Sequence, residues 1–398
     1  MGRLSELISS DDALPTPGDG VFETYPAWAR RLLVNCNEDK FTLLKLLRRN
    51  KHRKGSYAAK LSGALVGSDC IQAQLQTLES DVPFASGGYG SGCLIRGDVL
   101  LVSERRAVGS IFQVGEVHLY TRPSAGEDFV RQTGTHQNTQ INAGYWGEGI
   151  CGNRDLTVWA AGAPNESGGT GSVEIWTRSG TTLTFDEKIT PNHAQGTAYF
   201  GVELGMYGGD HLLVGSYTYD DGADTDAGNV EYWENVAGTW TYRSSFVRNA
   251  AFTAGQRFGR GIAMTSDSEC FVHSTTGSTT ESLVERWTRS GTTWTYQDSF
   301  TVPFGTGSIS TSKCQMDTDG TVLVFGAHRH DAVSNNEGLI LITDLNGTEL
   351  ASIEGDTLET ELGYGCSYDN GYVAAGAWLA DPSATANAGE VEVWKVCT

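Results

Sequence analysis

The sequence predicts an all-β protein, a six-bladed β-propeller closed by an N-terminal strand and preceded by an N-terminal arm that is partly extended and partly helical. Three observations predict it. A four-strand repeat recurs through most of the chain, glycine makes up 50 of the 398 residues, and proline only 9. Glycine is thus far above its usual share of about 7%, without the proline of a collagen or a disordered tract. With 39% hydrophobic residues, the chain can bury a large core.

The repeat contains an element of the form G-x-V-x-x-W, which we expect to be the third strand of each unit. Its last position falls on Tyr120, Trp176, Trp233, Trp287, Thr343 and Trp394, at spacings of 56, 57, 54, 56 and 51 residues. A short apolar strand precedes each copy, as in LLVGS at 212–216. One four-stranded sheet of this kind buries too little by itself, whereas blades packed face against face around an axis bury both faces. Six copies therefore predict six blades.

The two ends of the repeat region complement each other. The sixth copy stops at 397–398, before its fourth strand, while the segment 70–90 aligns with 184–201 and 241–259. We therefore expect a strand near 70–78 to complete the blade begun by 363–397, which leaves no exposed sheet edge. The sequence thus divides into an arm, residues 1–66, and a propeller, residues 67–398.

Several short elements of the repeat resemble those of the FG-GAP family, the repeat of integrin α-subunit propellers and of many bacterial and phage proteins. They are Phe200-Gly201, Phe258-Gly259, Gly162-Ala163, Gly326-Ala327 and the run WTRSGTTWTY at 287–296. The resemblance covers about residues 70–398. It implies a propeller that serves adhesion or protein–protein contact rather than chemistry.

Members of that family often carry a calcium loop between the second and third strands of a blade. The resemblance therefore implies a calcium site at the one loop that is acidic enough, with Asp220, Asp224 and Asp226 as ligands and Asp221 beside them. Carboxylates spaced two residues apart can converge on one hard cation. The alternative is a solvated acidic turn. No other cofactor is expected.

The sequence favours a protein that is not an enzyme. The Arg96-Gly97-Asp98 tripeptide corresponds to hairpin turns in the other repeats, so we interpret it as a turn rather than an integrin ligand. The RSG hairpins at 178–180 and 289–291 lack the aspartate of a sialidase box. Sialidase chemistry would also need an arginine cluster at the channel mouth, which sequence alone cannot place. The run 328–331 has ligand-type residues but no second cluster at metal spacing.

The cysteines follow the repeat. Four of them, Cys93, Cys151, Cys314 and Cys366, fall in the first strand of four blades, where other blades carry Gly205 and Ala263. Such small residues fit strands crowded around an axis, so these thiols are expected to be free and buried. Cys70 and Cys397 lie near the gap of the closing blade, where we hypothesise a disulfide. The alternative is two unpaired thiols near the chain ends.

The charge of the arm differs from that of the propeller. Residues 1–66 carry 11 Lys and Arg against 7 Asp and Glu, a net of +4, whereas the rest carries 17 against 41, a net of −24. Short helices are predicted at 26–34 and 38–49. A basic stretch from Lys45 to Lys60 begins within the second helix and contains no acidic residue. Its anchoring candidates are Lys45, Arg48, Arg49, Lys51, Arg53 and Lys54. It lacks the interleaved aromatics of a nucleic-acid site, so a solvated face or a clamp on an acidic protein is favoured.

Two functions remain. The first is a structural subunit of a large assembly, a virus or phage particle, in which the arm anchors the chain and the propeller contacts neighbouring structural proteins or a host-surface protein or glycan. It is favoured because the repeat family is commonly extracellular, yet the opening residues lack the apolar core of a secretory signal. The alternative is a secreted or cell-surface adhesion module. Insertion into a membrane is not expected, since no apolar run approaches about 18 residues.

Overall fold

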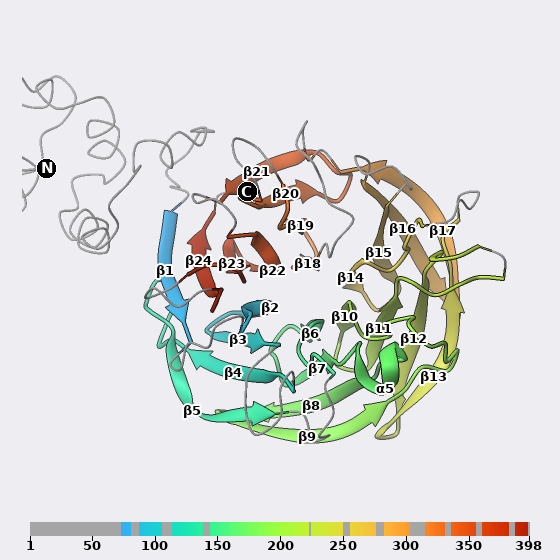
Figure 1. Ribbon diagram of the computed structural model, residues 1–398, viewed down its shortest axis with the longest axis horizontal. Helices are drawn as coiled ribbons and strands as arrows, with labels where there is room; N and C mark the ends of the chain where they lie inside the picture. Colours follow the sequence, from blue (N-terminus) through green and yellow to red (C-terminus); the bar gives the residue numbers. More distant parts are fainter. Residues whose placement is uncertain are drawn as a thin grey trace, which may run out of the picture. The chain divides into compact units, whose positions relative to one another are not determined.

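The computed structural model describes residues 73–80, 87–105, 114–137, 144–222, 224–249, 255–275, 282–302, 304, 315–330, 336–355, 360–381 and 387–396. They belong to one unit that begins at Ala73. Their strands form six four-stranded antiparallel sheets arranged as blades in a ring (Figure 1). The predicted six-bladed propeller is thereby confirmed. The arm, the anchoring candidates from Lys45 to Lys54, and the hypothesised Cys70–Cys397 disulfide lie outside the described residues.

The first three blades follow the chain in order. Blade 1 comprises β2 (Tyr89–Arg96), β3 (Val99–Glu104), β4 (Glu116–Thr121) and β5 (Val130–Gln137). Blade 2 comprises β6 (Ile150–Gly152), β7 (Val158–Gly162), β8 (Val173–Ser179) and β9 (Thr182–Ile189), with a single helical turn, α5 (Glu166–Gly169), between β7 and β8. Blade 3 comprises β10 (Leu204–Tyr207), β11 (His211–Ser216), β12 (Asn229–Val236) and β13 (Thr239–Phe246).

The remaining blades complete the ring. Blade 4 comprises β14 (Gly261–Ser266), β15 (Glu269–Thr275), β16 (Ser282–Ser290) and β17 (Thr293–Thr301). Blade 5 comprises β18 (Met316–Thr318), β19 (Val322–Ala327), β20 (Leu339–Asp344) and β21 (Glu349–Glu354). Blade 6 comprises β22 (Leu362–Asp369), β23 (Tyr372–Ala377), β24 (Glu390–Lys395) and β1 (Ala73–Glu79).

Blade 6 contains strands from both ends of the propeller. Strand β1 pairs antiparallel with β24, with Ala73 opposite Lys395 and Glu79 opposite Glu390. The sheet order is therefore β1–β24–β23–β22, and β1 takes the outer position that β5 or β9 holds in its own blade (Figure 1). Strand β1 lies where the alignment of residues 70–90 with the other repeats expected a fourth strand.

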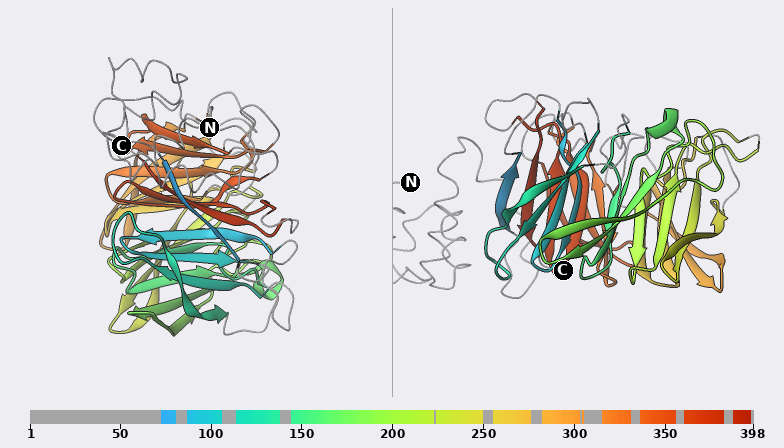
Figure 2. Two further views of the ribbon diagram at one scale, coloured as in Figure 1. Left: turned by 90° about the vertical axis from the view of Figure 1, so that its left-hand side faces the viewer. Right: turned by 90° about the horizontal axis from the view of Figure 1, so that it is seen from below.

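The first strand of each blade lines the axis, and the fourth lies at the rim (Figures 1 and 2). Burial follows this order: all eight residues of β22 are buried, whereas most of β17 is exposed or half-buried. Within the described residues, no helix is long and apolar enough to span a membrane.

The hydrophobic core lies between the blades. It consists of six clusters, and each draws its side chains from two neighbouring blades. Between blades 1 and 2, for example, Leu101 and Leu119 pack with Trp146, Trp159 and Trp176. The Trp159 and Trp176 rings are stacked with centroids 5.6 Å apart. The tryptophan of the repeat thus seals a blade border, and both faces of every blade are buried.

Glycines bring the backbones of adjacent blades into direct contact. A Cβ on Gly162 of blade 2 would lie 1.8 Å from the carbonyl oxygen of Gly201 in blade 3. Gly171 opens the G-x-V element with φ +84° and forms a parallel bridge with Phe200. The same approach recurs at three further borders among the described residues, between Gly215 and Gly259, Gly326 and Gly363, and Gly376 and Gly90. The Gly-Ala and Phe-Gly elements of the sequence are therefore the two sides of one contact.

A buried glutamate in the third strand holds the segment that leads into its blade. Glu231 is 1% exposed, and its carboxylate accepts hydrogen bonds from the backbone N–H groups of Asn192 (3.0 Å) and His193 (2.8 Å). Glu285 accepts the N–H of Asn249 at 3.2 Å in the next blade. The buried carboxylate thus satisfies backbone donors that the connecting segment would otherwise leave unpaired.

Replacing Gly162 by alanine tests the glycine contact. The new methyl group would collide with a backbone carbonyl that cannot rotate away, so we expect the free energy of unfolding to fall by about 2–3 kcal/mol. Gly196→Ala is the matched control, because a Cβ there meets nothing within 4 Å and the change should stay within about 0.5 kcal/mol. Chemical denaturation measures both. Equal stabilities of the two variants would contradict the close approach.

Candidate binding site

The innermost strands leave little space on the axis. The cavity between them has a volume of about 20 Å³ and is lined by β2, β6, β10, β14, β18 and β22. This is room for about one water molecule. Cys93, Cys151 and Cys366 line it together with Gly205 and Ala263, and the three cysteines are buried thiols that form no disulfide. The expected role of these cysteines as small buried residues is confirmed, whereas Cys314 lies outside the described residues.

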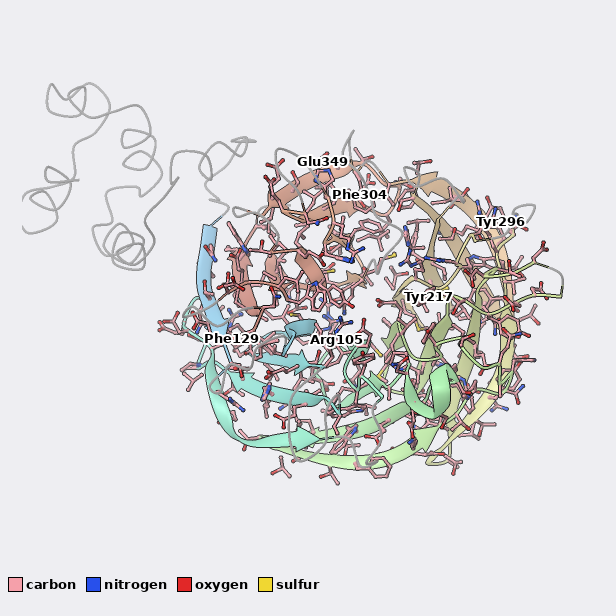
Figure 3. The ribbon with its side chains drawn as sticks, viewed as in Figure 1. Arg105, Phe129, Tyr217, Tyr296, Phe304 and Glu349 are labelled. Carbon is pink, nitrogen blue, oxygen red and sulfur yellow. The ribbon has the colours of Figure 1, made fainter. Side chains whose placement is uncertain are left out.

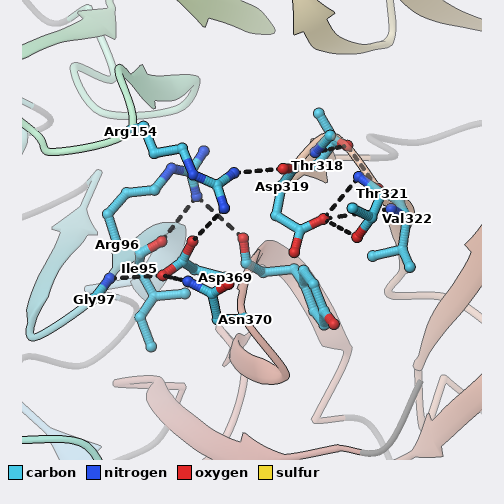
Figure 4. A network of polar contacts seen from close by, with 12 residues as sticks. Ile95, Arg96, Gly97, Arg154, Thr318, Asp319, Thr321, Val322, Asp369 and Asn370 are labelled. Atoms are coloured by element: carbon cyan, nitrogen blue, oxygen red, sulfur yellow. Dashed lines mark hydrogen bonds and ion pairs between the residues drawn. The ribbon is translucent and has the colours of Figure 1, made fainter.

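A buried ion pair crosses the axis at the end of the inner strands where they turn into the second strands. The Arg96 guanidinium donates to both oxygens of Asp317, each at 2.8 Å. Asp317 also accepts the backbone N–H of Tyr368 at 3.0 Å, and Asp369 accepts that of Gly97 at 2.8 Å. Figure 4 shows this end of the axis, where Arg154 joins the same network by donating to the carbonyl of Asp319. Side chains from four blades thus close this end.

The Arg96-Gly97-Asp98 tripeptide forms the turn between β2 and β3. Gly97 has φ +56°, which favours glycine, and the Arg96 side chain is buried in the ion pair just described. Asp98 accepts a hydrogen bond of 2.8 Å from Arg122. The turn interpretation is confirmed, because both charged side chains of the tripeptide are used within the propeller.

At the opposite end the axis widens into a pocket. Its volume is about 520 Å³, within the range of about 300–1,000 Å³ that is usual for small-molecule sites. All six blades contribute to its lining, five of them through segments that precede the first strand or follow the second, and blade 6 through Tyr364 in its first strand. The pocket therefore lies on the axis of the ring, and Figure 3 shows Arg105 and Tyr217 near its centre. We call this cavity the axial pocket.

Arginines dominate the charge of the axial pocket. Arg105, Arg257, Arg260 and Arg329 line it, against two glutamates, Glu148 and Glu203, among the described lining residues. The chain as a whole carries a net charge of −20. Three of these arginines also lie within ion-pair distance of a carboxylate, Arg105 of Glu148, Arg257 of Asp226 and Arg329 of Glu361, so the pocket presents guanidinium groups beside carboxylates.

One wall is a tight cluster of three side chains. The Arg105 Nη1 donates to both oxygens of Glu148, at 3.0 and 2.7 Å, and to the hydroxyl of Tyr364. The Tyr364 hydroxyl in turn donates to Glu148 at 2.5 Å. The guanidinium carbon lies 4.3 Å from the ring centroid of Trp378 and 4.8 Å from that of Tyr364. These contacts hold the cluster in one geometry.

Burial sets the protonation of this wall. It raises the pKa of Tyr364 well above its usual value, and the nearby charge of Glu148 raises it further. Burial by itself would lower the pKa of Arg105, but the Glu148 carboxylate outweighs it and the pKa rises. At neutral pH the wall therefore presents a protonated phenol and a charged guanidinium.

The opposite wall combines arginine with stacked tyrosines. The Arg260 side chain is 3% exposed, and its guanidinium carbon lies 5.1 Å from the ring centroid of Tyr217. The Tyr217 ring is stacked on that of Tyr199, with centroids 5.9 Å apart and planes at 17°. Arg257 lies 3.5 Å from the carboxylate of Asp226. Flat aromatic faces and guanidinium groups thus alternate on this wall.

The acidic loop pairs with an arginine of this wall. Asp220 Oδ1 accepts the backbone N–H of Asp226 at 2.9 Å, and Asp226 pairs with Arg257. Asp221 and Asp224 form a short antiparallel bridge. Among the described residues, no group of three or more His, Cys, Asp or Glu side chains could hold a metal ion. The structure thus does not gather Asp220, Asp224 and Asp226 as ligands, and the calcium site stays a prediction without support from their geometry.

The run 328–331 also has structural contacts. His328 and Arg329 approach the carboxylate of Glu361 at 3.7 and 3.2 Å, and His330 Nε2 lies 2.8 Å from the carbonyl oxygen of Phe304. The sequence did not reveal that Arg329 joins Arg105 and Arg260. Arg105 and Arg329 both follow a second strand, whereas Arg260 follows a Phe-Gly element, so no single position of the repeat relates the three.

Comparison with known proteins gives little beyond the fold. No protein-family profile matches the chain, and no curated protein matches it. Among solved structures, the chain is similar to that of a putative TolB from Agrobacterium tumefaciens, with 12% identity and a TM-score of 0.38. That match covers 77% of this chain and 90% of the other. A likeness of this size carries no argument about function, which therefore rests on the geometry of the axial pocket.

His273 lies behind the pocket wall that carries Arg260. Its side chain is 2% exposed, and its Nε2 lies against the hydroxyl of Ser282. Burial, together with the charge of Arg260, lowers the pKa of His273 to about 3. The imidazole is therefore neutral in the folded protein over most of the acidic range.

Acidification should destabilise the protein through His273. Its pKa is about 6.5 in the unfolded chain but about 3 when folded, so below pH 6.5 only the unfolded chain takes up the proton. We expect this residue to remove about 1.4 kcal/mol of stability per pH unit between about pH 6 and 3. The difference in unfolding free energy between wild type and His273→Gln, measured by urea denaturation across that range, isolates the effect from that of the carboxylates. A difference that does not change with pH would contradict it.

Loss of the axial ion pair should also destabilise the fold. Arg96→Ala leaves the carboxylate of Asp317 buried without its cation, which should cost about 3–5 kcal/mol of unfolding free energy. Asp298→Asn is the control at an exposed ion pair, because the side chains of Asp298 and Arg286 are 64% and 39% exposed, and it should change stability by less than about 1 kcal/mol. Thermal and chemical denaturation measure both. A folded Arg96→Ala protein of wild-type stability would show that the ion pair does not stabilise the fold.

Proposed function

We propose that this chain is a non-enzymatic binding module. In this proposal the propeller presents the axial pocket to a partner, and the arm, residues 1–66, anchors the chain in a large assembly, a virus or phage particle. The observation that carries the proposal is a blind pocket on the axis. All six blades line it, and the Arg96–Asp317 pair closes the axis at the other end. A partner can thus enter from one face only.

The state of the pocket side chains supports binding rather than catalysis. Glu148 is held by Arg105 and Tyr364, and burial keeps the phenol of Tyr364 protonated. A carboxylate and a hydroxyl that are fixed in this way form a preformed surface instead of a reactive pair. Preformed surfaces bind well because few rotamers must be ordered on binding.

The charge difference between arm and propeller supports the division of roles. The basic stretch from Lys45 to Lys54 complements acidic surfaces of neighbouring structural proteins, whereas the acidic propeller is repelled by nucleic acid and by anionic membranes. The FG-GAP resemblance fits the same proposal, since it implies a propeller used for contact. We propose a virion as the location and a host-surface protein or glycan as the partner of the pocket.

The second candidate is a secreted or cell-surface adhesion module, and the same pocket favours it. The two candidates share the binding face but differ in the role of the arm. In the adhesion module the arm has no assembly to hold, so association with a particle distinguishes them.

Co-sedimentation tests the proposed function. The full-length chain and a variant lacking residues 1–66 are mixed with particles from the native source and centrifuged. We expect only the full-length chain to travel with the particles, because the variant lacks the anchor, while its melting temperature should stay within a few degrees of the parent's.

A charge variant provides the matched control. Replacing Lys45, Arg48, Arg49, Lys51, Arg53 and Lys54 by glutamine keeps the arm at full length, and it should also abolish co-sedimentation if the basic stretch is the anchor. Co-sedimentation of the variant that lacks the arm would refute the anchoring role. Binding of the propeller to cell surfaces without any particle association would favour the adhesion module instead.

A further inference from the structure

We propose that the axial pocket recognises a sugar that carries a carboxylate, such as a uronic or nonulosonic acid at the end of a glycan. This inference rests on the proposed function in so far as the pocket is the binding face. It adds the chemical class of the ligand, which neither the fold nor the arm specifies. Three features of the lining support it: its arginines, its aromatic faces and its hydrogen-bond acceptors.

The arginines supply the recognition of a carboxylate. Arg257 and Arg260 reach the pocket from blade 4, and Arg329 reaches it from blade 5. A guanidinium is planar, always charged, and carries five donors in a fork that matches the two oxygens of a carboxylate. Arg260 is 3% exposed, so its charge acts in a medium that screens little. Arg257 and Arg329 also pair with Asp226 and Glu361, so a ligand carboxylate on this side shares the guanidinium donors with these side chains.

The tyrosines supply a surface for a sugar ring. Tyr199 and Tyr217 are stacked on each other beside Arg260, and Tyr145 and Tyr364 line the pocket toward Arg105. Aromatic faces pack against the C–H groups of a sugar while its hydroxyls point outward to polar partners. The stacked pair is held flat by its own contact, so it needs little rearrangement on binding.

The acceptors distinguish a sugar from a simple anion. Glu148, Glu203 and the amide of Asn165 also line the pocket. The two carboxylates repel a compact anion such as phosphate, whose negative charge is spread over all of its outer oxygen atoms. They favour a ligand that is anionic at one end and carries hydroxyl donors along its body, because each hydroxyl can donate to a carboxylate oxygen. The volume of about 520 Å³ leaves room for such a residue and for the start of the chain that follows it.

Calorimetric titration of the full-length protein tests the proposal. The probes are N-acetylneuraminic acid and glucuronic acid, with glucose as the neutral sugar, inorganic phosphate as the compact anion and a short glutamate-rich peptide as an acidic ligand without a sugar. We expect at least one of the two acidic sugars to bind at least tenfold more tightly than glucose, phosphate and the peptide.

Variants locate the binding. Arg329→Gln removes the charge of a side chain that is 44% exposed, so the fold should be kept, and it should weaken binding of the acidic sugar at least tenfold. Tyr199→Ala removes one face of the stacked pair and should also weaken it. Arg243→Gln is the matched control, because that arginine pairs with Glu234 on blade 3 and does not line the pocket. It should bind as the wild type does. Melting temperatures confirm that each variant is folded.

The outcomes separate this inference from the proposed function. Equal binding of glucose or phosphate, tighter binding of the glutamate-rich peptide, the absence of binding by both acidic sugars, or wild-type affinity in folded Arg329→Gln and Tyr199→Ala would each overturn the sugar proposal. The co-sedimentation of full-length wild type is independent of all four. If the chain travels with particles but binds neither acidic sugar, only the inference about the ligand fails. If Arg329→Gln loses the sugar and still co-sediments, pocket and anchor are separate, as proposed.

Discussion

Direct contact between the backbones of neighbouring blades is the constraint on which the rest of this propeller depends. At Gly162 and Gly201, and at the equivalent pairs, the chains approach so closely that even a methyl group has no room. This contact fixes how far apart two blades stand at one end of the ring. The tryptophans and aliphatic side chains between the blades can then fill the remaining space at the density of a protein interior. A repeat with a side chain at those glycine positions would hold its blades apart and leave the clusters loosely packed.

The spacing of the blades also determines how much space is left on the axis. Six inner strands brought this close leave a cavity of only about 20 Å³ between them, so the channel is nearly filled along its middle. Its two ends are then free to differ. At one end long polar side chains meet across the axis, with Arg96 and Asp317 as a neutralised pair. At the other end the segments diverge and leave a lined pocket in which arginines outnumber carboxylates. The two ends of the axis thus differ through a few residues per blade, although the strands of all six blades are arranged alike.

The propeller fold could be predicted from the sequence because the repeat shows the same pattern of strands and turns several times. Six copies of G-x-V-x-x-W gave the number of blades, and the turn residues at 96–98 had counterparts in other repeats. The pocket was different, since Arg105, Arg260 and Arg329 each occur at a position where other blades carry other residues. No periodicity relates them, and only the closure of the ring brings them together. In the acidic loop the spacing of the aspartates suggested calcium ligands. The direction of a side chain cannot be predicted from that spacing: Asp220 accepts a backbone N–H, and Asp226 pairs with Arg257.

The pairing of β1 with β24 has a consequence for how the protein acquires its structure. Five of the blades are built from consecutive strands and can form from local hairpins, whereas the sixth joins Ala73 to Lys395. Bringing such distant segments together costs conformational entropy of the chain. The contacts that offset this cost form only when the other blades are already in place. During synthesis the ribosome must therefore release almost the whole propeller before its last sheet can form. Until then β1 has no strand of its own blade to pair with and can pair with other chains, so this step is the one at which a chaperone would be of most use.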